Sequence, residues 1–193
     1  MTYFISDLHF GHRNVMGYDK RPFSDDIEKH DEFLIQQWNS VVNTTDDVWI
    51  LGDISWYPAQ KTIAIFERLN GIKHLVVGNH DKKLLRCQQV RELFIEITDY
   101  KELEFDDGSG VVLSHYPIPC YNKHFYGWHH LYGHVHSTFE WDMIEKFQED
   151  MRAQGKLSSM YNCGCMMPYM NYKPRTLTQI LEANAEKEDC GND

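Results

Sequence analysis

The chain has 193 residues, of which 42% are hydrophobic and 25% are charged, and its formal net charge is -10. This length suffices for one domain with a sizeable core, so we expect residues 1–193 to form a single domain. The negative charge argues against a broad groove for extended nucleic acid, because the phosphates would be repelled. It does not exclude a nucleotide or another small phosphate ester held by bound cations, which add positive charge locally.

The cysteines and the amino-terminal residues indicate a cellular compartment. The five cysteines are Cys87, Cys120, Cys163, Cys165 and Cys190. An odd, scattered set is typical of free thiols in a reducing environment. The chain runs straight into Tyr3-Phe4-Ile5 without a secretory leader, and no apolar stretch approaches the roughly 20 residues of a membrane helix. We therefore expect a cytoplasmic protein without a membrane partner. Cys163 and Cys165 are favoured as small core residues, with a metal site as the alternative.

The first half of the chain alternates short apolar runs with helical patterns. Strands are expected at Tyr3–Ile5, Val48–Leu51 and Leu75–Val77, and a loop at Leu8–Phe23. Helices are expected from Ser24 or Asp25 to Val41 and from Pro58 to Gly71, and a further helical stretch at Lys82–Leu93. The helices are recognised by apolar residues at helical spacing and by capping residues at their ends. This order predicts a parallel sheet with right-handed crossovers.

The second half has a different pattern. Ile95–Phe105 and Val111–Ser114 flank the turn Asp106–Gly110, which predicts an antiparallel hairpin. We then expect a short strand at Leu131-Tyr132 and a partly helical stretch at Thr138–Met160, whose buried face is formed by Trp141, Ile144, Phe147 and Met151. A last strand is expected at Tyr161–Met166. A final helix is opened by the capping box of Thr176 and Gln179 and runs through Ala185, and a frayed tail follows at 186–193.

Five of the apolar runs end abruptly in side chains that can bind metal. The candidate ligands are Asp7, His9, Asp53, Asn79, His115, His134 and His136. In an α/β sheet the carboxyl ends of the strands meet at one edge, so these side chains are expected to converge. Seven mixed ligands are too many for one tetrahedral zinc ion and contain too few carboxylates for calcium. They suit two divalent transition-metal ions, Mn²⁺, Fe²⁺, Zn²⁺ or Ni²⁺, that share a bridging carboxylate.

The same residues carry a resemblance to a known family. The segments Asp7-Leu8-His9, Gly52-Asp53, Gly78-Asn79-His80-Asp81, Ser114-His115 and Gly133-His134-Val135-His136 resemble, in order, the five sequence blocks of the calcineurin-like metallophosphoesterases, and in particular their small, stand-alone bacterial or phage-type members. The resemblance implies a four-layer α/β/β/α sandwich with two mixed sheets.

The resemblance also implies a role for each residue. One ion would take Asp7, His9, Asp53 and His136, and the other Asp53, Asn79, His115 and His134, with Asp53 bridging. His80 would bind no metal and would protonate the leaving group or stabilise the transition state. The expected activity is hydrolysis of phosphate mono- or diesters by a hydroxide that bridges the two ions.

One departure from the family narrows the substrate. The protein Ser/Thr phosphatases continue their second block with a further Asp and an Arg, whereas this chain continues after Asp53 with Ile54-Ser55-Trp56-Tyr57-Pro58. This favours a phosphodiester or nucleotide substrate over a phosphoprotein, and it leaves open what orients His80. The alternatives are a non-catalytic metal-binding interaction scaffold on the same fold and a nuclease that acts on long nucleic acid.

Several further residues have two interpretations. Arg13 and Asn14 either bind substrate phosphate or belong to a surface loop. Tyr116, Tyr121, Tyr126 and Trp128 either stack on a base or aryl group or pack in the core and at the rim. Thr138–Met160 either caps the site or is a solvated helix. The physiological substrate, the native metal and the oligomeric state are left open by the sequence.

Overall fold

The computed structural model describes residues 1–189, which form two four-stranded sheets. The first sheet contains, in this order, β1 (Thr2–Ile5), β2 (Asp47–Ile50), β3 (Ile72–Val76) and β4 (Glu96–Thr98). The second contains β5 (Tyr100–Glu104), β6 (Gly110–Ser114), β7 (His129–Tyr132) and β8 (Met160–Asn162). The first sheet is entirely parallel, whereas β5 pairs antiparallel with β6 in the second. The expected α/β class with two sheets is confirmed, although only the second sheet is mixed.

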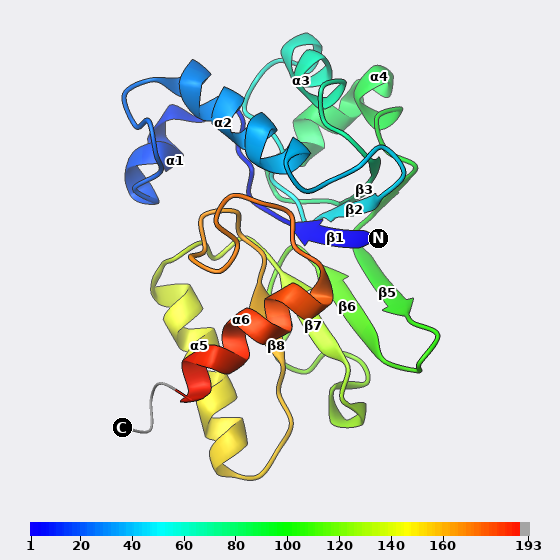
Figure 1. The fold of residues 1–193 in the computed structure, drawn as a ribbon, viewed down its shortest axis with the longest axis vertical. Coiled ribbons are helices and arrows are strands. Elements are labelled where there is room, and N and C mark those ends of the chain that lie inside the picture. The colour runs from blue at the N-terminus through cyan, green and yellow to red at the C-terminus, as the bar shows by residue number, and fades with distance from the viewer. Residues whose placement is uncertain (190–193) are drawn as a thin grey trace.

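Helices lie beside both sheets. Those of the first half are α1 (Arg13–Tyr18), α2 (Ile27–Asn39), α3 (Ala59–Phe66), the 3-10 helix η1 (Asp81–Arg86) and α4 (Gln88–Arg91). The second half adds the 3-10 helix η2 (His124–Tyr126), α5 (Phe139–Ala153) and α6 (Leu177–Asp189). Figure 1 shows α2, α3 and α4 beside the first sheet, and α5 and α6 beside the second. One hydrophobic core cluster contains residues of both sheets, among them Ile5, Leu75, Leu113 and Leu131.

The predicted strand at Ile95–Phe105 is interrupted, which is a correction to the sequence analysis. Its first part is β4, which pairs with β3, and its second part is β5, which pairs with β6 in the other sheet. At the break, the Thr98 hydroxyl donates to the Tyr100 carbonyl at 2.8 Å. The chain therefore passes from one sheet to the other within a single apolar pattern. Periodicity cannot reveal such a passage, because both parts keep strand geometry.

Several helix boundaries also differ from the prediction. Helix α1 lies inside the expected loop at residues 8–23. Helix α2 begins after Asp26, whose carboxylate accepts from the Lys29 N–H at 3.1 Å, and α3 ends at Phe66 rather than at Gly71. The helical stretch at residues 82–93 is divided by Cys87, whose backbone is extended. Tertiary contacts outweigh helix propensity at these short segments.

The last two helices follow the prediction more closely. The side chain of Gln179 accepts from the Thr176 N–H at 3.1 Å, and the Thr176 hydroxyl accepts from the Gln179 N–H at 3.3 Å, as expected for a capping box. Helix α6 continues to Asp189 instead of ending at Ala185. Of the predicted frayed tail, residues 190–193 lie outside the described residues. Within residues 1–189, no helix combines the length and apolarity that crossing a membrane requires.

Helix α5 packs on the second sheet with a less buried face than predicted. Trp141, Ile144 and Phe147 contact a core cluster but are only partly buried. The buried residue of this helix is Gln148, whose amide donates to the Met160 carbonyl at 3.1 Å and accepts from the Met160 N–H at 2.7 Å. A polar side chain therefore ties α5 to the start of β8. The cysteines that follow β8, at positions 163 and 165, are fully buried in the core, as the favoured interpretation expected.

Candidate metal centre

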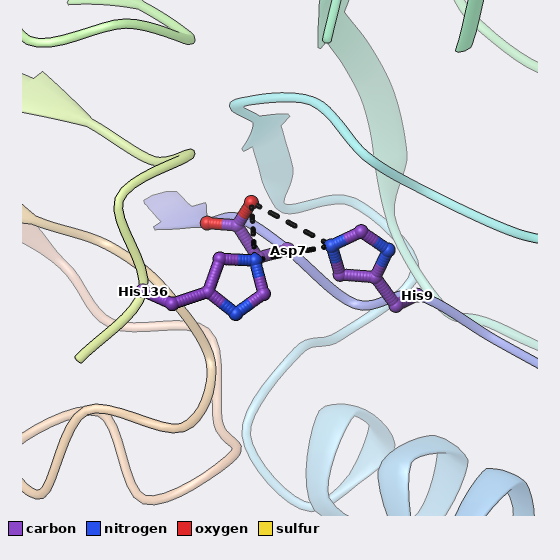
Figure 2. Close-up of side chains that lie close together, drawn as sticks. All are labelled: Asp7, His9 and His136. Atoms are coloured by element: carbon purple, nitrogen blue, oxygen red, sulfur yellow. Dashed lines mark hydrogen bonds and ion pairs between the residues drawn. The ribbon is translucent and has the colours of Figure 1, made fainter. Parts of the chain in front are cut away.

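The candidate ligands lie in the loops that follow β1, β2, β3, β6 and β7, and two groups of three have ligand atoms within 4.8 Å of one another. The first group is Asp7, His9 and His136, and the second is Asp53, His115 and His134. Figure 2 shows the three side chains of the first group pointing toward one another. The structure therefore divides the two histidines of Gly133-His134-Val135-His136 between two groups, which is the division that the family resemblance implies.

Asp53 belongs to the second group and also lies close to His9 of the first group. Its Oδ2 is 3.5 Å from Nε2 of His9 and 3.7 Å from Nε2 of His115. Asn79 completes the second group, because its Oδ1 is 2.9 Å from Nε2 of His115 and 3.0 Å from Nδ1 of His134. Donor atoms that bind one cation at roughly 2.0–2.2 Å lie about 3–3.6 Å from one another. The spacing of these imidazole, carboxylate and amide donors therefore fits a pair of divalent cations with Asp53 as the shared ligand.

An unusual backbone conformation brings the ligands together. The φ angle is 55° at Asp7, 50° at His9, 57° at Asp53, 70° at His134 and 48° at His136. Non-glycine residues rarely adopt this left-handed conformation, and it persists only where the surrounding structure holds it. All five residues lie in the loops after β1, β2 and β7, within four residues of the end of the strand. Left-handed non-glycine residues cost conformational energy, and strained residues of this kind cluster at functional sites.

Glycines beside the ligands permit the close approach of the loops. A Cβ on Gly52, whose φ is +89°, would lie 2.5 Å from Nδ1 of His115. A Cβ on Gly78 would collide with the Asp53 side chain and lie 2.5 Å from the Asp53 backbone nitrogen. A Cβ on Gly133 would lie 2.7 Å from the Asp7 carboxylate. The glycine of each of these blocks is therefore a packing requirement of the site.

Asp81 holds two of the loops in place. Its buried carboxylate accepts hydrogen bonds from the backbone N–H of Asp53, Ile54 and Gly78, at 2.9, 2.9 and 2.8 Å. These bonds tie the loop after β2 to the loop after β3. Sequence reasoning assigned Asp81 no role of its own, although its position directly after His80 was the available signal.

Asp19 is a second residue that the sequence analysis did not select. Its carboxylate oxygens lie 2.9 and 3.0 Å from Nδ1 of His136. It belongs to a segment predicted to be a loop, and no motif marked it. Only the folded chain brings residues 117 positions apart into contact.

Burial dominates the electrostatics of the groups. It raises the pKa of Asp53 to about 6, with a further contribution from the Asp7 carboxylate. Burial also lowers the pKa of His9 well below its ordinary value. At His136 burial lowers the pKa, but the hydrogen bond to Asp19 and the charges of nearby carboxylates outweigh it, so that this pKa is raised. Buried carboxylates are costly without a positive partner, and a bound cation would remove that cost.

His80 lies beside the two groups and belongs to neither. Its side chain is 41% exposed, and its Nε2 is 4.0 Å from Oδ2 of Asp53. Its backbone N–H donates to the Asp53 carboxylate at 3.0 Å. The imidazole ring contacts Trp56, with 4.6 Å between the ring centroids, and Trp56 is in turn stacked on His12 at 4.0 Å. The Trp56 ring therefore contacts the imidazole of His80 directly, and the catalytic role of His80 stays a prediction.

The remaining sequence candidates occupy different environments. Arg13 and Asn14 are exposed in the first turn of α1, so their role in phosphate binding stays a prediction. Tyr116 is 50% exposed and its ring lies 4.5 Å from that of His134. Tyr121 is buried and its hydroxyl donates to the carbonyl of the buried Trp128 at 2.7 Å, which favours the packing interpretation for both.

Two cavities are relevant to the location of a substrate. One of about 250 Å³ adjoins the second group and is lined by Asn79, Lys82, Tyr100, His115 and Tyr116, among others. A larger cavity, of about 630 Å³, lies between α5, β8 and α6, and none of the candidate ligands lines it. The smaller cavity adjoins the candidate metal centre, because the candidate ligands Asn79 and His115 form part of its wall.

The fold and the paired groups together define an α/β protein with a candidate centre for two metal ions. The chain belongs to the same family as the uncharacterized protein MJ1445 of Methanocaldococcus jannaschii, to which it is 32% identical over 184 residues, or 93% of this chain and 89% of that protein. It is also 45% identical over 83 residues to the gene 66 protein of Mycobacterium phage L5, covering 42% of this chain and 39% of the phage protein.

A solved structure has a similar fold. The crystal structure of AQ665 from Aquifex aeolicus, a protein of unknown function, superposes with a TM-score of 0.70 over 95% of this chain and 98% of its own, at 26% sequence identity. No family model matches the chain. These comparisons establish the family and the fold, and the activity has to be argued from the site.

Proposed function

We propose that this chain is a metal-dependent phosphoesterase of the calcineurin-like metallophosphoesterase superfamily. The observation that carries the proposal is the place of Asp53 Oδ2, which is 3.5 Å from Nε2 of His9 and 3.7 Å from Nε2 of His115. A carboxylate between two histidine-containing groups is the arrangement expected of two cations that share a ligand. The five ordered sequence blocks and the two-sheet fold support the same assignment.

The proposal assigns six of the candidate ligands to one ion each and Asp53 to both. Asp7, His9, Asp53 and His136 would hold the first ion, and Asp53, Asn79, His115 and His134 the second. Two bound divalent cations of this class, Mn²⁺, Fe²⁺, Zn²⁺ or Ni²⁺, polarise phosphoryl oxygens and activate water for attack on phosphorus. The chain's own contribution is to hold the donors at fixed spacing on loops that Asp81 ties together.

His80 is assigned to the leaving group. It is exposed enough to meet a substrate, and its Nε2 lies near the shared carboxylate without joining either group. When the phosphorus–oxygen bond breaks, the departing oxygen takes up the developing negative charge and needs a proton. A histidine beside the reacting phosphate can supply it, which typically contributes a factor of about 10²–10⁴ to the rate.

Exposed aromatic side chains on both sides of the site favour a small diester or a nucleotide as substrate. Trp56 is 49% exposed and contacts His80, whereas Tyr116 is 50% exposed and contacts His134. A phosphodiester carries an organic group on each side of its phosphorus, so planar groups could contact both rings. The cavity of about 250 Å³ beside Tyr116 would receive one of them, with Lys82 on its wall.

The two alternatives predict other features. A non-catalytic interaction scaffold would not need His80 beside the paired groups, yet the chain has it. A nuclease for long nucleic acid would need a basic face, and the net charge of -10 opposes one.

The proposal is tested by metal analysis and by two model substrates. The purified protein is expected to bind close to two transition-metal ions per chain. With added Mn²⁺ it is expected to hydrolyse bis-p-nitrophenyl phosphate, a diester, faster than p-nitrophenyl phosphate, a monoester. Metal binding without hydrolysis of either ester would favour the scaffold, and a folded protein that binds no metal would refute the metal centre.

A further inference from the structure

A buried ion pair lies next to the first group of candidate ligands. The side chains of Arg21 and Asp19 are 0% and 3% exposed, and Nη2 of Arg21 is 2.8 Å from Oδ2 of Asp19. Nε of Arg21 donates to the same oxygen at 2.9 Å. Burying two charges is costly unless their remaining donors and acceptors are also satisfied. The other contacts of this pair therefore indicate what the pair is for.

The other contacts of Asp19 lead to His136. Both of its carboxylate oxygens lie within 3.0 Å of Nδ1 of that histidine. A carboxylate in an ion pair only accepts hydrogen bonds, so Nδ1 must carry the hydrogen. A neutral imidazole has one N–H, which leaves the lone pair on Nε2. That atom faces the group, 3.2 Å from Nε2 of His9 and 3.7 Å from Oδ1 of Asp7.

The other contacts of Arg21 lead to the loop after β1. Nη1 donates to the Leu8 carbonyl and Nη2 to the Asp7 carbonyl, both at 2.8 Å. The Asp7 carbonyl also accepts from Sγ of Cys165 at 3.3 Å. Asp7 has a φ of 55°, a conformation that needs support from its surroundings. The guanidinium therefore holds both the left-handed turn that carries Asp7 and the carboxylate that orients His136.

We propose that Asp19 and Arg21 are positioning residues for the first metal ion, Asp19 by fixing His136 with Nε2 toward the group and Arg21 by anchoring Asp19 and the Asp7-Leu8 turn. This inference rests on the metal centre of the proposed function and adds residues outside the five sequence blocks. It concerns the first ion alone. In the second group, Nδ1 of His115 is bonded to a neutral acceptor, the Leu51 carbonyl, at 2.8 Å.

The first experiment measures metal binding by titration calorimetry on Asp19→Ala and Asp19→Asn variants. Removing a carboxylate that orients a metal-binding histidine typically lowers metal affinity about 10–100-fold. Asp19→Ala is expected to weaken one of the two binding events by this factor and to leave the other unchanged. Asp19→Asn is expected to lie between Asp19→Ala and the unaltered protein, because the amide oxygen can still accept from Nδ1–H but carries no charge.

Asp25→Ala is the matched control, since Asp25 is an exposed aspartate six positions further along the same connection. It is expected to bind both ions with unaltered affinity. Two tight binding events in Asp19→Ala, or an equal loss of both, would overturn the proposal.

The second experiment needs no variant and so does not depend on whether Asp19→Ala folds. Nitrogen-15 NMR of the metal-free protein, at a pH high enough to leave imidazoles neutral, reports the tautomer of His136. The Nδ1–H tautomer is expected, and the Nε2–H tautomer would overturn the proposal. Both experiments are independent of turnover. If Asp19→Ala weakens metal binding as expected but the unaltered protein hydrolyses no ester, the proposed function alone would be refuted.

Discussion

The backbone N–H of Asp53 donates to the buried carboxylate of Asp81 at 2.9 Å, which fixes the turn that carries the shared candidate ligand. Asp81→Asn places an amide NH₂ group where backbone donors now find an acceptor. Each buried N–H left without a partner costs about 1–3 kcal/mol, so the free energy of unfolding should fall by at least that amount. Urea denaturation measures it, and calorimetry should show weaker metal binding. Unaltered stability and metal content in this variant would contradict the role given to Asp81.

Gly78→Ala should damage the site through space alone. The new Cβ would collide with the Asp53 side chain and lie 2.5 Å from its backbone nitrogen, so the loops after β2 and β3 must separate. We expect the loss of at least one metal ion per chain, measured by elemental analysis. The matched control is Gly17→Ala in α1, where a Cβ meets nothing within 4 Å. That variant should keep its metal and gain roughly 0.5–1 kcal/mol in helix stability.

His80→Ala should separate catalysis from metal binding. Because His80 belongs to neither group of ligands, the variant should retain close to two ions per chain. Its rate of diester hydrolysis should fall by about 10²–10⁴, the usual contribution of a general acid. Full activity would remove His80 from the mechanism, whereas loss of metal would assign it to the ligand set instead.

Tyr116→Ala should raise the KM for a diester substrate. Its ring is 50% exposed beside His134 and lines the cavity of about 250 Å³. Loss of one aromatic contact, about 0.5–1.5 kcal/mol, corresponds to a rise in KM of about 2–12-fold for bis-p-nitrophenyl phosphate. The control is Tyr126→Ala, at a tyrosine that is 84% exposed in η2 and outside that cavity. Equal KM values in the two variants would exclude Tyr116 from substrate binding.

His130 should make the stability of the metal-free protein depend on pH. It is fully buried, its Nδ1 lies 2.9 Å from the Val112 carbonyl, and its Nε2 accepts from the Ile118 N–H at 2.9 Å. Burial lowers the pKa of His130 from 6.5 to about 4, although its backbone hydrogen bonds partly oppose this. Between these values the unfolded chain binds a proton that the folded chain does not.

The contribution of His130 is therefore fully present above about pH 6.5 and is lost progressively as the pH falls toward 4, by roughly 3 kcal/mol in total. Chemical denaturation of the protein and of His130→Gln between pH 4 and 7.5 measures it. The free energy of unfolding of the variant should depend less steeply on pH. Some dependence should remain, because burial lowers the pKa of His30 to about 4 as well. An equal slope in both proteins would show that His130 is not kept neutral by the fold.

Candidate ligands such as Asp7, Asp53 and His115 could be selected from the sequence because each lies shortly after an apolar run. The α/β class follows from the same alternation of strands and helices. These properties are local: a few adjacent residues determine where a strand ends and what side chain comes next.

The tertiary structure decided everything that depends on contacts between distant segments. The division of residues 95–105 between two sheets depends on which partner strand is available to each part. Asp81 can accept hydrogen bonds from both loops only because the loops after β2 and β3 lie side by side. Asp19 sits in a segment with no motif, and it matters because the fold brings it to His136. Periodicity and spacing describe neighbours along the chain, whereas hydrogen bonds, burial and left-handed turns at the ligands are set by neighbours in space.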